Sequence, residues 1–150
     1  MRGMSIRDNL QNALEAANSE RIQASERVQE FDNQLVQLKA KTGNARAKLA
    51  VVNETCEKAD KNYQKFREYC GSSSPDARNA LELELRRLAQ DQHVAVLSVQ
   101  SAENSIRHLQ RNIIDLERTR AGAQGNFLAA NTRWEQIKKE LESSAADLFD

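Results

Sequence analysis

Turn-forming and aromatic residues are scarce in this sequence of 150 residues. It contains five glycines and one proline, and aromatic side chains make up 5% of it. A β-sandwich or an α/β enzyme of this length needs turn residues about every ten positions. Here the proline and most of the glycines mark only two places. The composition therefore excludes sheet-based folds and predicts an all-α protein.

Residues that usually carry catalysis or metal binding are also few. The two histidines, His93 and His108, lie far apart on one predicted helix, and no Glu-x-x-His pair of the kind found in carboxylate-bridged metal bundles is present. The sequence has no glycine-rich phosphate loop and no Cys-x-x-Cys motif. We therefore expect no catalytic residue, no cofactor, no metal site and no enzymatic activity.

The cysteines and the N-terminus bear on the compartment. Cys56 and Cys70 lie on one predicted helix, about 21 Å apart along its axis, which is too far for a disulfide within that helix. This usage is typical of a reducing setting. The N-terminal residues form no apolar signal segment, and no apolar run approaches the length of about eighteen residues that spans a bilayer. We expect a cytoplasmic protein that does not span a membrane.

What the sequence does contain is an apolar repeat of seven residues, sustained over two long segments. Written as heptads abcdefg, nearly all a and d positions are apolar, which is the signature of a left-handed coiled coil. Gly43, Gly122 and Gly125 weaken a helix locally, but the heptad phase passes through them unshifted, so we predict continuous helices. The a positions run from Arg7 to Cys70 and from Leu85 to Leu148, and the d positions from Leu10 to Phe66 and from Leu81 to Ser144.

One corner separates the two segments. Gly71 suits the left-handed residue that ends a helix, Ser74 suits the N-cap of the next helix, and Pro75 fits its first turn. We predict one domain over residues 1–150, with helix one over about 5–70, a loop over 71–74, helix two over about 75–146, and a short acidic tail over 147–150. Leu148 and Phe149 make that tail a candidate docking motif.

Two long helices joined by so short a loop fold back on each other. The predicted fold is therefore all-α, a long antiparallel two-helix coiled-coil hairpin. As a dimer, such a hairpin can form a four-helix bundle.

The pairing register stays open at this stage. In an antiparallel coiled coil an a residue faces a d residue, so the numbers of paired residues add to a constant, and the heptads allow 144 or 151. The first register sets Ala17 against Phe127 and the second sets it against Trp134, and both alternate small and large side chains. Arg21 and Arg120 at a positions either extend their heads to solvent or lock the register.

A second set of apolar residues lies outside the a and d positions. Most of these residues are at b positions, and b is next to e around the helix. Because the e side of one helix meets the e side of the other in an antiparallel pair, the set shares one broad face. We interpret this face as an interface for a second copy or for a partner's helix. Its residues are Ile22, Val36, Ala50, Val96, Ile114, Ala121 and Leu128.

Charge is balanced overall, with 22 basic and 22 acidic residues, so no net field steers the chain to nucleic acid or to anionic membranes. Locally, however, the middle of both helices is basic. A run of this kind can bind a polyanion, although no aromatic residue is interleaved with it for base stacking. The candidate contacts are Lys39, Lys41, Arg46, Lys48, Arg107 and Arg111.

These features favour a non-enzymatic interaction protein, a scaffold or spacer that self-associates and forms a homo-oligomer. The alternative is a binder of nucleic acid or of an anionic surface through the basic middle. In shape alone, a lone hairpin of two long helices resembles the small stalk proteins that associate with flagellar and type III secretion ATPases, and also various scaffolding or effector coiled coils. That resemblance implies an accessory protein of a secretion-type machine, and no functional residue is carried over from it.

Overall fold

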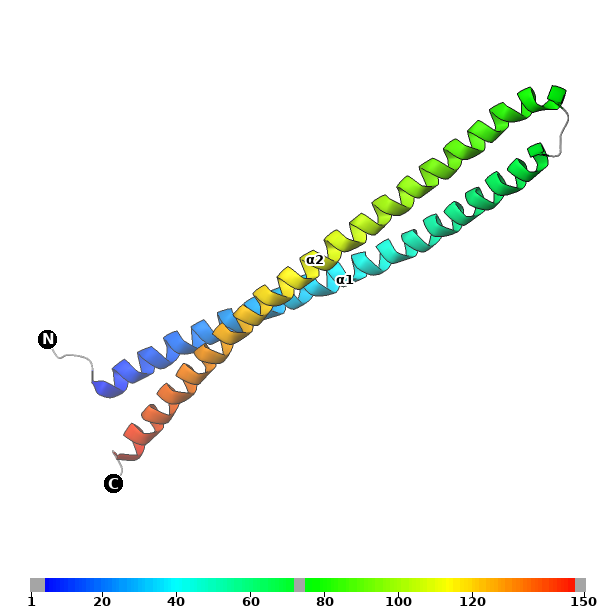
Figure 1. Cartoon of the computed structure of the whole chain (residues 1–150). Helices are drawn as coiled ribbons and strands as arrows, with labels where there is room; N and C mark the ends of the chain where they lie inside the picture. The colour runs from blue at the N-terminus through cyan, green and yellow to red at the C-terminus, as the bar shows by residue number, and fades with distance from the viewer. Residues whose placement is uncertain (1–4, 72–74, 148–150) are drawn as a thin grey trace. The chain divides into compact units, whose positions relative to one another are not determined.

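A computed structural model describes residues 5–71 and 75–147 of the chain. It contains two helices, α1 (Ile6–Gly71) and α2 (Pro75–Asp147), which pack against each other as an all-α helical hairpin (Figure 1). Both helices are continuous, α1 through Gly43 and α2 through Gly122 and Gly125, as predicted.

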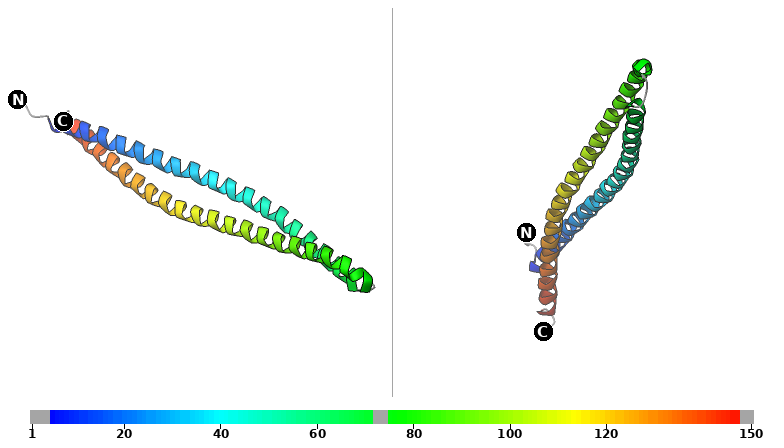
Figure 2. Two further views of the ribbon diagram at one scale, coloured as in Figure 1. Left: turned by 90° about the horizontal axis from the view of Figure 1, so that it is seen from above. Right: turned by 45° about the vertical axis from the view of Figure 1, so that its right-hand side comes forward.

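The described residues form two compact parts. The terminal part comprises residues 5–37 and 113–147, and the apical part comprises residues 38–71 and 75–112. Within each part, a segment of α1 lies beside a segment of α2 (Figure 2). In the terminal part, the start of α1 and the end of α2 lie near each other.

Burial in both parts follows the predicted heptads. Every buried residue is at an a or d position, and every other described a or d position is half-buried except Arg7, which is exposed. The apolar stripe of each helix is therefore covered by the other helix, which confirms the predicted seam. The buried residues are Ala17, Val28, Leu35 and Ala123 in the terminal part, and Thr42, Ala95 and Ile106 in the apical part.

α1 begins with a cap that the sequence analysis did not use. The Ser5 Oγ accepts a hydrogen bond of 3.1 Å from the Asp8 N–H, and the Ser5 carbonyl accepts one of 3.0 Å from the Asn9 N–H. Serine at the N-cap satisfies a donor that the first turn leaves free. Asp8 also lies in that first turn, where a negative charge is favourable. The Ser-x-x-Asp pattern is a sequence signal for this start.

The end of α1 differs from the prediction. Gly71 was expected to be left-handed, yet it is the last residue of α1, and no glycine in the described ranges has a positive φ. Glycine adopts right-handed helical angles as well as left-handed ones, so its presence alone did not require a reversal at this residue. α2 begins at Pro75 as predicted. Residues 72–74, including the expected cap Ser74, and residues 148–150 with the expected docking motif lie outside the described residues.

Contacts between the helices decide the pairing register. In the terminal part the Arg120 Nε donates to an Asp32 carboxylate oxygen, and in the apical part the Gln92 Nε2 donates to an Asp60 carboxylate oxygen at 2.6 Å. The residue numbers in both pairs add to within one of 151. The register of 144 is therefore wrong, because it would displace the two helices by one heptad and separate both pairs.

These two contacts have the same construction. Arg120 and Gln92 occupy a positions of α2, Asp32 and Asp60 occupy e positions of α1, and the two pairs are four heptads apart on each helix. A polar residue at an a position fixes register when it has a partner in only one alignment. Arg21, at an a position of α1, has other kinds of partner. Its guanidinium stacks on the Trp134 ring at 4.0 Å from the centroid, and it donates to the Asn18 Oδ1 at 2.7 Å.

Candidate interaction surfaces

The two helices present two broad faces, and the heptad positions of the residues on each face differ. In the terminal part, Glu20 and Arg133, both at g positions, form an ion pair of 3.0 Å between the helices. A groove of about 230 Å³ on the same side is lined by g residues of both helices, among them Arg27 and Asn126. We call this side the g face. The e and b positions of both helices then share the opposite side, which we call the b/e face.

Five of the seven predicted interface residues lie on the b/e face of the terminal part. The four large ones are substantially exposed, with 46% of Ile22, 68% of Val36, 49% of Ile114 and 55% of Leu128 open to solvent. In the observed register Ile22 lies level with Leu128, and Val36 lies level with Ile114. Ala121, also exposed, lies midway between the two levels. The hairpin thus presents two pairs of aliphatic side chains on a face that it does not itself cover.

The other two predicted residues, Ala50 and Val96, lie in the apical part. Both are exposed, but they lie at different levels of the hairpin and do not form a matched pair. The predicted interface residues that form matched pairs therefore all lie in the terminal part.

Several exposed apolar residues of the apical part were missed in the sequence analysis. They occupy c and f positions, outside the b and e positions on which the predicted interface rested. A count of large aliphatic residues at every outer heptad position would have found them. They are Val51 and Val94 at c positions and Leu83 and Leu97 at f positions.

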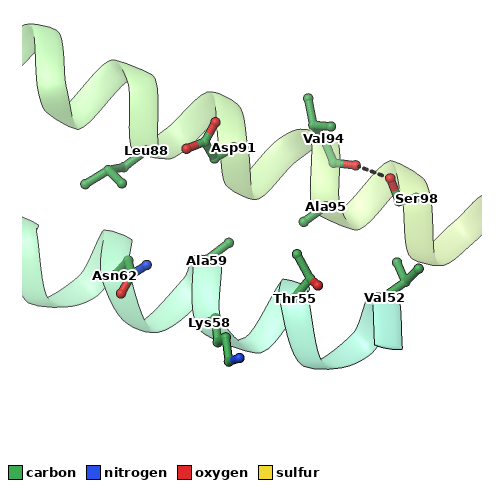
Figure 3. A pocket seen from close by; sticks show the side chains of 10 residues that line it. All are labelled: Val52, Thr55, Lys58, Ala59, Asn62, Leu88, Asp91, Val94, Ala95 and Ser98. Carbon is green, nitrogen blue, oxygen red and sulfur yellow. Dashed lines mark hydrogen bonds between the residues drawn. The ribbon is translucent and has the colours of Figure 1, made fainter. Parts of the chain in front are cut away.

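A groove of about 490 Å³ runs along the g face of the apical part (Figure 3). Ala59 and Ala95 lie at core positions in it, and these small side chains leave room between the helices. Thr55 and Asp91 are among its polar lining residues. The groove is an open channel between two helices, with an apolar floor and polar edges.

An exposed ion network lies beside this groove. Arg87 hydrogen-bonds to Glu84 and contacts Asp91 at 3.4 Å. The hydrogen bond from Arg87, helped by its charge, lowers the pKa of Glu84, and the Glu84 carboxylate raises the pKa of Arg87. Glu84 therefore stays ionised at neutral pH, and its contribution to stability is lost only as the pH falls through its lowered pKa. Because these groups are exposed to water, that contribution is small.

The six candidate polyanion contacts all lie in the apical part. Residues 38–53 of α1 and 104–112 of α2 lack acidic side chains, and antiparallel pairing sets these segments beside each other, where both line a groove of about 380 Å³. Lys41 and Lys48 line this groove on the g face, together with Asn44 and Ser105.

The remaining candidate contacts lie elsewhere around the same level. Lys39 and Arg46 occupy e positions on the other face, Arg107 contacts Glu103 at 4.0 Å, and Arg111 is at an f position. The structure thus brings the six residues to one level but distributes them around the hairpin.

Within residues 5–71 and 75–147, no group of three or more His, Cys, Asp or Glu side chains is placed to hold a metal ion. Over the same ranges, neither helix has an apolar stretch long enough to cross a bilayer. Cys56 and Cys70 are free thiols and are half-buried.

Comparison of the chain with protein-family models, with curated proteins and with solved structures gives no match. Surface chemistry and heptad geometry are therefore the basis on which a function can be proposed.

Proposed function

We propose that this protein is a non-enzymatic coiled-coil interaction protein, a scaffold or spacer that self-associates through the b/e face of its terminal part. Two pairs of aliphatic residues support this function, because they are exposed on one face and each pair lies at one level of the hairpin. The pairs are Ile22 with Leu128 and Val36 with Ile114. Single exposed aliphatic residues are ordinary on protein surfaces, but matched pairs on one face of two helices are typical of bundle interfaces.

The expected strength of association follows from the area available. Full burial of one aliphatic side chain contributes about 1.5 to 3 kcal/mol, and two copies bring eight such side chains together. Since about half of each is already covered by its own helix, the gain is roughly 6 to 12 kcal/mol. Association costs about 4 to 15 kcal/mol of lost freedom. We therefore expect a dimer that forms and dissociates with protein concentration.

The test replaces two of these residues by charged ones. We expect the double variant Val36→Glu, Ile114→Glu to lose self-association in sedimentation experiments, because an unpaired carboxylate buried in the interface cancels the apolar gain. Its helicity by circular dichroism should stay close to that of the wild type, because b positions lie outside the seam.

A matched control makes the same change elsewhere. Val51→Glu with Val94→Glu alters two exposed valines in the apical part and should leave association intact. A wild type that is monomeric at high micromolar concentration, or a double variant that associates as strongly as the wild type, would refute the proposal.

Polyanion binding is a second candidate function, favoured by Lys41 and Lys48 in one groove beside segments without acidic residues. A labelled single-stranded oligonucleotide should then bind more weakly as salt rises, through counterion release. The variant Lys41→Gln, Lys48→Gln should reduce the salt slope by about one to two. Lys138→Gln with Lys139→Gln in the terminal part is the control. Binding that is absent at low salt, or insensitive to salt, rejects this function.

A further inference from the structure

We infer that the b/e face of the terminal part is covered by a second copy of this chain in antiparallel orientation, about a two-fold axis passing through Gln29 and Ala121. This inference rests on the proposed function, because it specifies the partner and geometry of the same face.

The two b rows have a pattern that a two-fold axis reproduces. On α1, Ile22 and Val36 lie one heptad on either side of Gln29, and on α2, Ile114 and Leu128 lie one heptad on either side of Ala121. Gln29 and Ala121 are at the same level in the observed register. A half-turn about that level sets Ile22 of one copy on Val36 of the other, and Leu128 on Ile114. Every large aliphatic residue of the face then meets another one.

A parallel dimer satisfies the apolar residues equally well. In that arrangement α1 of one copy lies on α2 of the other at the same level, so Ile22 meets Leu128 and Val36 meets Ile114. Apolar burial alone therefore leaves the orientation open, and the neighbouring charges must decide it.

Those charges disfavour the parallel dimer. The next b positions towards the chain ends are Glu15 and Glu135, which are exposed and lie at the same level. A parallel dimer gathers both carboxylates of both copies at one level, and like charges held together in an interface are destabilising. The cation nearest to Glu135 on this face of α2 is Lys138. Its ammonium group lies over the Trp134 ring, 5.1 Å from the centroid, and is therefore already engaged by that ring.

The antiparallel dimer separates those carboxylates, because a half-turn about the level of Gln29 and Ala121 carries the Glu15 and Glu135 side chains of the two copies to opposite ends of the shared face. Both residues lie two heptads from that level, Glu15 before Gln29 on α1 and Glu135 after Ala121 on α2. Avoidance of like charges therefore selects the antiparallel orientation from the two that the apolar residues allow.

Crosslinking between chains that each carry one cysteine tests the orientation. In a background with Cys56→Ser and Cys70→Ser, we would mix chains carrying Ile22→Cys with chains carrying Val36→Cys and treat them with a short bis-maleimide. A second mixture pairs Ile22→Cys with Leu128→Cys. The antiparallel dimer predicts that a covalent dimer forms in the first mixture and that none forms in the second. It also predicts a covalent dimer from Ala121→Cys alone, because that residue lies on the axis.

The outcomes separate this inference from the proposed function. Crosslinking of Ile22→Cys with Leu128→Cys and not with Val36→Cys would establish the parallel dimer and overturn the inference. A wild type that sediments as a dimer while neither mixture crosslinks also overturns it, but leaves self-association standing. A wild type that stays monomeric at high concentration removes both.

Discussion

Leu35→Glu should unfold the terminal part of the hairpin, whereas the same substitution one residue later, Val36→Glu, should leave it folded. Leu35 is 7% exposed at an a position, and Val36 is 68% exposed at a b position. Removing a buried leucine side chain costs about 2 to 5 kcal/mol, and burying a carboxylate without a partner adds to that loss. Small domains have about 5 to 15 kcal/mol of stability in total.

Thermal melting followed by circular dichroism measures both effects at a protein concentration where the chain is monomeric. We expect a large fall in the melting temperature for Leu35→Glu and a small change for Val36→Glu. Equal falls for the two variants would show that the seam does not follow the heptads. Because both substitutions introduce the same side chain into the same turn of α1, net charge cannot explain a difference, and the helix propensities of leucine and valine differ by only about 0.4 kcal/mol.

The seam could be predicted from the sequence because it follows from one physical requirement. Each helix has one continuous apolar stripe, at its a and d positions, and when a short corner folds the helices back on each other these two stripes bury one another. A single shift of phase within either helix would have moved Leu35 or Ile106 to the surface. The uninterrupted period therefore determined which face of each helix is inside.

The register could not be predicted from that stripe. Ala17 finds a large partner in Phe127 under one alignment and in Trp134 under the other, so apolar packing did not distinguish them. The discriminating side chains are Asp32 and Asp60. They are at e positions, outside the stripe, and carboxylates at e positions are common enough that neither one signals a contact by itself.

The candidate interface could be predicted from the sequence only in part. The b positions of Ile22, Val36, Ile114 and Leu128 could be found by counting heptads, and the shared face followed from antiparallel pairing. Their arrangement as two level pairs needed the register, which came from the contacts of Arg120 and Gln92. The same register places Glu15 level with Glu135, the feature that distinguishes the two orientations of a dimer.

Replacing both polar a residues of α2, with Arg120→Leu and Gln92→Leu, should raise the melting temperature and abolish the single register. Leucine at an a position buries more apolar surface than a half-buried polar group, a gain of about 1 to 2 kcal/mol at each site. Asp32 is only half-buried, so losing its partner costs little. The two alignments that the apolar stripe permits then become close in energy.

Spin labels at Leu14 and Ile137, which face each other in the observed register, measure the consequence within the terminal part. The wild type should give one short distance, and the double variant should add a second population about 5 Å longer, because a slip of about 10 Å along the axis combines at a right angle with a helix separation of about 8 to 10 Å. Arg133→Leu, which removes the exposed ion pair with Glu20 but leaves the seam unchanged, should keep the single distance. A double variant that also keeps one short distance would mean that the corner or the apolar layers, and not these polar contacts, set the alignment of the two helices.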